Sequence, residues 1–327
     1  MRALALGLCG LVAALFAVSL TVGPAEIGPG ESLRALVMGD AGPLTLVMRE
    51  IRLPRALLAA LVGGGLGLAG AAMQGYLRNP LADPGLIGVS ASAALGAVLA
   101  IQTGVAAAVW IGLPAMALIG AALGVGLVLM LAGQHGGSLT LILAGIAVSA
   151  LAGALTALVL NLSPNPFAAS EIVFWTMGSL ADRSMSHLWL ALPLVVAGAA
   201  VLLRLGPALD ALTLGEDAAA SLGVRVERLR LSLVAGTALI VGGTTAVAGA
   251  IGFVGLVIPH ILRPLVGARP ARLLWASALG GAALILAADI AVRVVVPERD
   301  LKLGVLTALV GAPVFLHLIW RSRRLEA

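Results

Sequence analysis

The sequence predicts an all-α membrane protein with about ten transmembrane helices. Hydrophobic side chains make up 61% of the 327 residues and charged side chains only 11%, and the mean hydropathy is +1.11. Soluble domains carry about 25% charged residues, so this chain could not cover a water-exposed surface with polar groups. Its apolar residues form continuous runs rather than an alternating pattern, which favours helices over a membrane β-barrel.

Individual spans follow from length, because a helix that crosses about 30 Å of hydrocarbon needs about 20 apolar residues. We expect membrane-spanning helices at residues 3–22, 56–77, 86–101, 110–132, 139–160, 187–205, 231–250, 252–266, 273–295 and 304–320. The first run also resembles a signal peptide, but it is longer than an ordinary signal-peptide core and no clear A-x-A site follows it. The eighth run carries Pro259 and His260 near its end, so it could be a tilted or broken helix.

The distribution of basic residues predicts that both termini lie in the cytoplasm. With the N-terminus inside, twelve of the 20 lysines and arginines fall in inner segments and eight in outer ones, as the positive-inside rule requires. Arg49, Arg52 and Arg55 break this rule at the outer mouth of the second helix. They either meet an acidic partner outside the membrane or anchor the helix near the lipid headgroups.

A weak internal repeat relates the second and seventh predicted helices. After a shift of 179 residues, nine of 26 positions are identical; in the first copy they are Gly63, Gly64, Ala69, Gly70, Ala71, Leu77, Pro80, Leu86 and Gly88. Helices five spans apart run in opposite directions, so the pattern predicts an inverted repeat of helices 2–5 and 7–10. Recurrent packing of glycine and alanine in membrane helices is the alternative explanation.

Few side chains in the chain could carry chemistry. The only lysine, Lys302, is followed by Leu303, so the phosphate-binding loop G-x-x-x-x-G-K-[ST] is absent and we expect no nucleotide hydrolysis by this chain. The four histidines lack the spacing of metal ligands, so we expect neither a metal nor a cofactor. Within the spans we find only Asp289 and Arg293, one helical turn apart and able to pair. Proton-coupled carriers usually keep several buried carboxylates along their path, and the spans of this chain hold too few of them. The energy for any transport must therefore come from elsewhere.

The inner loop 206–230 contains a predicted short helix at residues 214–222. Thr213 and Glu216 have the spacing of a capping box, and Gly223 provides a C-terminal stop. Such a helix suits docking of a cytoplasmic partner, although capped interfacial helices are also common.

Seven motifs in this chain, taken in order, resemble the FecCD-type permease family. They are Arg52–Arg55 (RLPR), Gly70–Gln74 (GAAMQ), Arg78–Pro84 (RNPLADP), Gly85–Ser90 (GLIGVS), Leu214–Gly223 (LGEDAAASLG), Gly252–Arg263 (GFVGLVIPHILR) and Gly311–Phe315 (GAPVF). The resemblance covers about residues 45–320 and implies the membrane subunit of a type II ABC importer for iron-siderophores, haem or vitamin B12. It implies a single permease domain over residues 1–327 in the bacterial inner membrane, with ten helices and both termini inside.

The resemblance also implies partners and functional residues. The partners are a second copy of the chain, two cytoplasmic ATPase subunits and a periplasmic substrate-binding protein, with membrane lipid around them. The coupling helix that contacts the ATPase comprises Leu214, Gly215, Glu216, Asp217, Ala218, Ala219, Ala220, Ser221, Leu222 and Gly223. The binding protein docks on Arg52, Arg55 and Arg293. The positions near the cytoplasmic gate are Asn79, Leu81 and Ser138, and the fifth and tenth helices line the path.

The chain departs from the family pattern at two places. Arg78 and Asp83 stand where the vitamin B12 branch tends to carry glutamates, which brings the chain closer to the haem and siderophore branches. Arg299, Asp300 and Lys302 replace a plainer E-L-P-V-G run at the outer end of the ninth helix.

Three classes of function compete on these observations. An ABC importer permease fits all of them. A secondary carrier of small solutes would need no ATPase, and an intramembrane enzyme would need a catalytic cluster that the sequence lacks. The order of preference for the cargo is haem, ferric siderophore and then cobalamin.

Overall fold

The computed structural model describes residues 2–23, 28–39, 42–133, 137–295 and 301–326, and within these ranges it contains helices and no strand. The α-helices are α1 (Arg2–Thr21), α2 (Pro29–Val37), α3 (Pro43–Leu46), α4 (Leu53–Leu77), α5 (Val89–Gln102), α6 (Val105–Ala108), α7 (Gly112–Ala132), α8 (Ser138–Asn161), α9 (Pro166–Thr176), α10 (Met185–Arg204), α11 (Gly206–Leu212), α12 (Glu216–Ser221), α13 (Val226–Ala248), α14 (Val254–Leu262), α15 (Pro270–Val295) and α16 (Leu303–Glu326). A π-helix, η1 (Val47–Arg52), joins α3 to α4, and two 3₁₀ turns, η2 (Pro84–Ile87) and η3 (Pro264–Val266), precede α5 and α15.

Each of the ten predicted spans coincides with a helix: α1, α4, α5, α7, α8, α10, α13, α14, α15 and α16. Among the described residues, seven helical stretches are long and apolar enough to cross a membrane, and the apolar helices α5 and Leu303–His317 are shorter. The predicted span 252–266 contains the 9-residue α14, which is about 14 Å long, roughly half the hydrocarbon thickness. Pro259 lies inside α14, and Pro264, which has no backbone N–H to continue the helix, begins the 3₁₀ turn η3; the span is therefore a short helix followed by a separate turn rather than one continuous helix.

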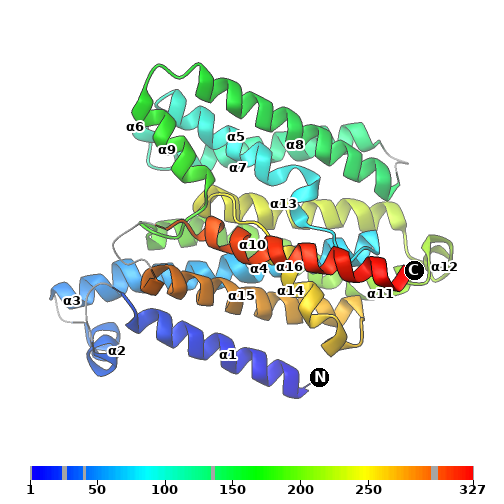
Figure 1. Ribbon diagram of the computed structural model, residues 1–327, viewed down its shortest axis with the longest axis horizontal. Coiled ribbons are helices and arrows are strands. Elements are labelled where there is room, and N and C mark those ends of the chain that lie inside the picture. The colour runs from blue at the N-terminus through cyan, green and yellow to red at the C-terminus, as the bar shows by residue number, and fades with distance from the viewer. Residues whose placement is uncertain (1, 24–27, 40–41, 134–136, 296–300, 327) are drawn as a thin grey trace.

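Both termini lie at one end of the molecule, as Figure 1 shows, together with α12. The helices α2, α3, α6 and α9 lie at the opposite end. This arrangement agrees with both termini lying on one side of the membrane, and their cytoplasmic placement stays a prediction. Hereafter we call these two ends the inner end and the outer end, following the orientation that the basic residues predict.

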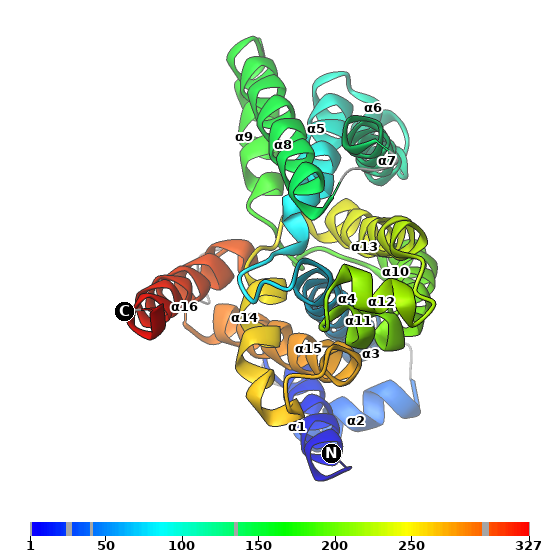
Figure 2. The same cartoon turned by 90° about the vertical axis from the view of Figure 1, so that its right-hand side faces the viewer.

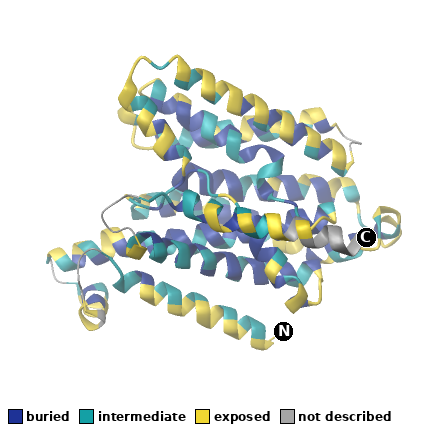
Figure 3. Ribbon diagram, in the orientation of Figure 1, coloured by how far each residue is buried: buried dark blue, intermediate teal, exposed yellow. Residues whose placement is uncertain are grey.

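The core is built around α4, which packs most extensively on α15. Figure 3 shows buried residues concentrated in these central helices and a mostly exposed α8. The backbones of α4 and α15 touch: a Cβ added at Gly63 would clash with the carbonyl oxygen of Gly281, and one added at Gly67 would clash with that of Ser277. Close backbone approach at small residues is the usual way in which membrane helices gain packing energy.

The helices α4 and α13, which carry the weak internal repeat, pack against each other in opposite directions. Gly65 in the middle of α4 faces Ile240 and Thr244 of α13. Tyr76 at the end of α4 interacts electrostatically with Arg230 near the start of α13. The opposite course expected for these two segments is thus confirmed, while the full inverted repeat stays a prediction.

Gly63→Val should weaken the bundle, because its side chain has no space between α4 and α15. Overpacking of this kind costs about 1–3 kcal/mol, so the temperature at which the detergent-solubilised protein unfolds should fall by several degrees. Gly126→Val on the exposed face of α7 is the matched control, since a Cβ at Gly126 would meet nothing within 4 Å. Equal unfolding temperatures for the two variants would show that the α4–α15 contact does not limit stability.

Candidate functional site

The segment from α11 to α12 forms a projection at the inner end of the molecule (Figure 1). Leu209 and Leu212 of α11 are buried, and the Asp210 carboxylate accepts a hydrogen bond of 2.8 Å from the backbone N–H of Ala271 at the start of α15. In α12 only Ala219 is buried. The projection is therefore fixed at its base and free along α12.

The exposed surface of α12 combines acidic and apolar groups. Glu216 and Asp217 occupy its first turn, where negative charge is favourable beside the helix N-terminus. Leu214 and Leu222, which flank the helix, are 68% and 65% exposed. An exposed apolar patch with a polar rim is typical of a protein contact surface rather than of a simple connector.

The predicted capping box at this helix is wrong. The Thr213 hydroxyl donates to the carbonyl oxygen of Asp210 at 2.6 Å, because Thr213 is the helical C-cap of α11. Gly215, with φ +106°, is the N-cap of α12, so the helix covers 216–221 rather than 214–222. Gly223 has φ +86° and lies past the end of α12, so the predicted glycine stop is confirmed.

At the outer end, Arg52 and Arg293 hold the C-terminus of α1. The guanidinium of Arg52 donates to the carbonyl oxygens of Leu20 and Thr21, both at 3.0 Å. That of Arg293 donates to the carbonyl oxygens of Ser19 and Val22. The last carbonyls of a helix lack intrahelical partners and carry partial negative charge, so two cations satisfy them.

Asp289 links Arg293 to a third arginine, Arg55. Its carboxylate accepts a hydrogen bond of 2.8 Å from Arg55 of α4 and forms an ion pair with Arg293 at 2.9 Å, as predicted from their spacing. Asp289 is 1% exposed, and a buried carboxylate of this kind is tolerated only when it is well paired.

The outer arginines differ in exposure. Arg52 is 4% exposed, and the side chains of Arg293 and Arg55 are 8% and 18% exposed. Arg49 is exposed and donates to the carbonyl oxygen of Leu36 in α2. Thus Arg52 and Arg293 turn toward α1, and Arg55 is the most accessible of the three arginines assigned to docking.

The predicted gate residues fall on two elements. Asn79 and Leu81 are in the loop after α4, where the Asn79 side chain accepts from the Leu81 N–H at 2.9 Å. In the same loop the Asp83 carboxylate accepts from the Gly85 N–H, and burial raises the pKa of Asp83. Ser138 is the first residue of α8, two turns before α8 crosses η2 at Gly145.

Sequence reasoning missed the role of Gln74, which it treated only as part of a motif. The buried Gln74 amide donates to the carbonyl oxygens of Ala82, Gly255 and Leu256, at 3.2–3.4 Å. Its oxygen accepts from Arg263 at 2.8 Å. This side chain therefore joins α4, the gate loop and α14. The sequence did contain a signal for this role, because Gln74 is a lone amide side chain in an otherwise apolar helix.

An open groove of about 640 Å³ follows one side of α16. Its walls are Thr176 and Met177 at the end of α9, the segment around Phe253, and α16 from Gly304 to Leu316. The tenth predicted helix therefore lines a groove, whereas α8, the fifth, contributes no lining residue in the single chain.

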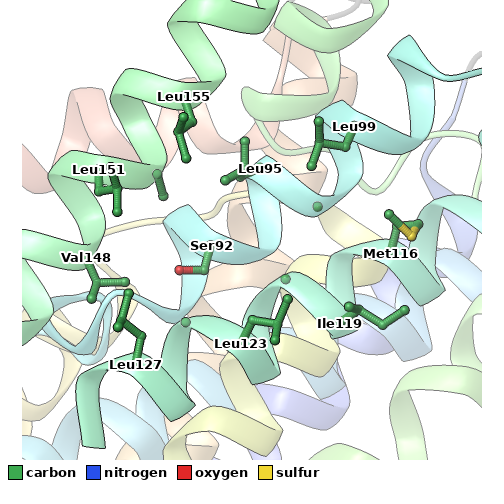
Figure 4. A pocket seen from close by; sticks show the side chains of 14 residues that line it. Ser92, Leu95, Leu99, Met116, Ile119, Leu123, Leu127, Val148, Leu151 and Leu155 are labelled. Carbon is green, nitrogen blue, oxygen red and sulfur yellow. The ribbon is translucent and has the colours of Figure 1, made fainter. Parts of the chain in front are cut away.

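A second hollow, of about 230 Å³, lies between α5, α7 and α8 (Figure 4). Leucines such as Leu95, Leu123 and Leu151 line it, and Ser92 is its only hydroxyl-bearing or charged residue. In the part of the chain that the structure describes, this lining is therefore apolar apart from one hydroxyl.

Comparison with known proteins assigns the chain to a family. Residues 11–321 match the FecCD transport family. The ferric enterobactin permease FepD of Escherichia coli is 40% identical over 329 residues, covering 99% of this chain and 97% of that protein. The vitamin B12 permease BtuC of Klebsiella pneumoniae is 40% identical and covers 97% and 93%. The hemin permease HmuU of Yersinia pestis is 40% identical and covers 84% and 83%.

A solved structure agrees with these relatives. A metal-chelate type ABC transporter in an inward-facing conformation superposes with a TM-score of 0.88 at 33% identity, covering 98% of this chain and 100% of that one. The resemblance carried by the seven motifs is thereby confirmed. The chain belongs to the FecCD transport family and is the membrane permease subunit of an ABC importer.

Proposed function

We propose that the chain imports an iron chelate, haem or a ferric siderophore, or else cobalamin, across the bacterial inner membrane. It works as a homodimer with two separate cytoplasmic ATPase subunits and a periplasmic binding protein, and both of its termini are cytoplasmic. The observation that carries the proposal is the exposed acidic and apolar surface of α12 on a fixed base. The sequence of the chain has no phosphate-binding loop, and this surface of α12 offers a separate ATPase a place to bind.

The mechanism is alternating access driven from outside the chain. The loaded binding protein docks at the outer end, ATP binding closes the ATPase dimer, and the α12 helices move as rigid bodies with their α11 bases. Each step shifts a population between two arrangements of the bundle through differential contacts. The groove along α16 borders the path, and a second copy would close its open side.

The alternative, a secondary carrier, finds little support in the charged groups of the bundle. Asp289 is a buried carboxylate inside a described span, and it is held by two arginines. To carry a proton, this carboxylate would have to give up both ion pairs. It is therefore a poor carrier of protons.

Glu216→Arg should uncouple the permease from its ATPase by placing a positive charge on the first turn of α12. We expect ATP-driven uptake in proteoliposomes to fall by about tenfold, the size of a lost charged interface contact, with the ATPase lost on copurification. Glu227→Arg reverses an exposed carboxylate at the start of α13 and is the matched control. Uptake by Glu216→Arg at the control's rate would contradict the coupling role.

Arg55→Gln should weaken docking of the binding protein, since Arg55 is the most exposed member of the assigned trio. The loss should be about tenfold at low ionic strength and should shrink in high salt, because salt screens exposed charges. The measurement is binding-protein affinity for the reconstituted complex by surface plasmon resonance.

Arg34→Gln, which removes an exposed charge from α2 at the same end, provides the comparison for Arg55→Gln. If both variants bind with wild-type affinity, Arg55 serves only the pair with Asp289.

A further inference from the structure

A polar pocket of about 210 Å³ lies at the outer end of the molecule, where the end of α9 meets the loop before α10 and the start of α16. Trp175, Ser179 and Arg183 line it together with the exposed or charged side chains of Glu171, Asp182 and Lys302. Neither the coupling mechanism nor the docking site uses these residues.

Two donors in this lining have no acceptor among the described residues. Trp175 is 8% exposed, and its indole N–H is buried without a hydrogen bond. The Nε–H of Arg183 is likewise buried without a partner. Native structures leave few buried donors unsatisfied, so two in one pocket call for an explanation.

The charged residues around the pocket differ in how far they are exposed to water. Glu171 and Asp182 are exposed, so water screens them. Arg183 is half-buried, and desolvation lowers the pKa of its guanidinium, with Asp182 opposing the shift. The guanidinium nevertheless stays protonated. A poorly hydrated guanidinium beside a free indole N–H is suited to a carboxylate, which accepts hydrogen bonds at both oxygens.

The pocket adjoins the groove along α16. Trp175 precedes Thr176 and Met177, which line the groove, and the Gly304 N–H donates to the Gly178 carbonyl, joining the end of α9 to the start of α16. Figures 1 and 2 show these two helix ends next to each other. A solute entering the groove from the outer end passes this pocket.

We propose that this pocket binds a carboxylate of the cargo at the outer mouth of the groove, with Arg183 and Trp175 as its donors. This inference rests on the proposed importer function and narrows the cargo to chelates that carry free carboxylates. Haem, with two carboxylates, fits this description, and so does a carboxylate siderophore. Cobalamin, whose side chains are amides, does not.

A glutamate or aspartate of the binding protein is the other carboxylate that could reach this end. The cargo is favoured because the two unpartnered donors are buried and the acidic residues around them are exposed. A broad protein surface would rest on the exposed Glu171 and Asp182 before it reached these donors, whereas a small solute enters the pocket between them.

The test uses the full permease–ATPase complex in lipid nanodiscs, with haemin and haemin dimethyl ester as probes. The two share the ring and the iron, but esterification removes both anions. We expect the wild-type complex to bind haemin about tenfold more tightly than the ester, as for a charge-assisted contact. Equal affinities, or no binding of either probe, would overturn the proposal.

Two variants assign the effect to the pocket. Arg183→Gln removes the charge, and Trp175→Phe removes the N–H while keeping an aromatic ring, so each should lower the preference for haemin over the ester toward unity. Glu171→Gln, a neutralised exposed acid of the same pocket, should keep or increase the preference. Wild-type preference in both Arg183→Gln and Trp175→Phe would refute the assignment, provided that each variant elutes as the intact complex on gel filtration.

Two further readouts separate this proposal from its alternatives. Weaker docking of the cargo-free binding protein in Arg183→Gln, with an unchanged preference for haemin, would show that the pocket serves the partner and would overturn the cargo site. ATP-driven uptake that depends on Glu216 tests the importer function independently. If only the pocket proposal is wrong, ATP-driven uptake still depends on Glu216. If the importer function is wrong, uptake does not depend on Glu216, whatever the affinities for haemin and its ester are.

Discussion

The contact between α4 and α15 positions much of what this permease uses. Backbone contact at Gly63 and Gly281 fixes the distance between the helices, and two turns away it brings Arg55 to 2.8 Å from Asp289. A buried ion pair is favourable only with good geometry, which rigid neighbouring backbones provide. The same carboxylate holds Arg293, and Arg293 holds the end of α1. The first helix packs one apolar face on α15, and these arginines fix its end.

The opposite ends of these two helices carry the inner machinery. Gln74 ties the end of α4 to the gate loop and to α14, while the start of α15 receives Asp210 of α11. In the proposed mechanism, a displacement of α12 would pass to α11 through a short connection and from there to α15 through the hydrogen bond of Asp210. Because interiors are close-packed, such a displacement moves helices as units rather than dissipating within a loop. Among the ten helices that match predicted spans, α14 is the shortest, with nine residues.

The sequence predicted the positions of the helices better than their contacts. Apolar runs located all ten helices, and the glycine after α12 ended it where expected, because both signals are local. The capping box failed because Thr213 belongs to α11, a helix that the sequence analysis did not distinguish. The pairing of Arg55 with Asp289 joins residues 234 positions apart, so no local pattern contains it. The exposure of the outer arginines likewise depends on where α1 ends, and only the packed bundle determines that.

The distribution of polar groups explains how a passage can be selective without holding its cargo. Among the residues that the structure describes, the groove along α16 has no charged residue in its lining, so it would offer a bulky chelate contact area and few strong bonds. Its outer mouth, in contrast, adjoins a pocket with a guanidinium and an indole N–H. The proposed pocket would bind the solute before it enters the groove, at a point from which the solute can still dissociate to the outside. A smooth interior then lets the cargo leave as readily as it entered, since strong binding inside would raise the barrier to exit. Separating recognition from passage in this way suits a permease that takes its energy from another subunit.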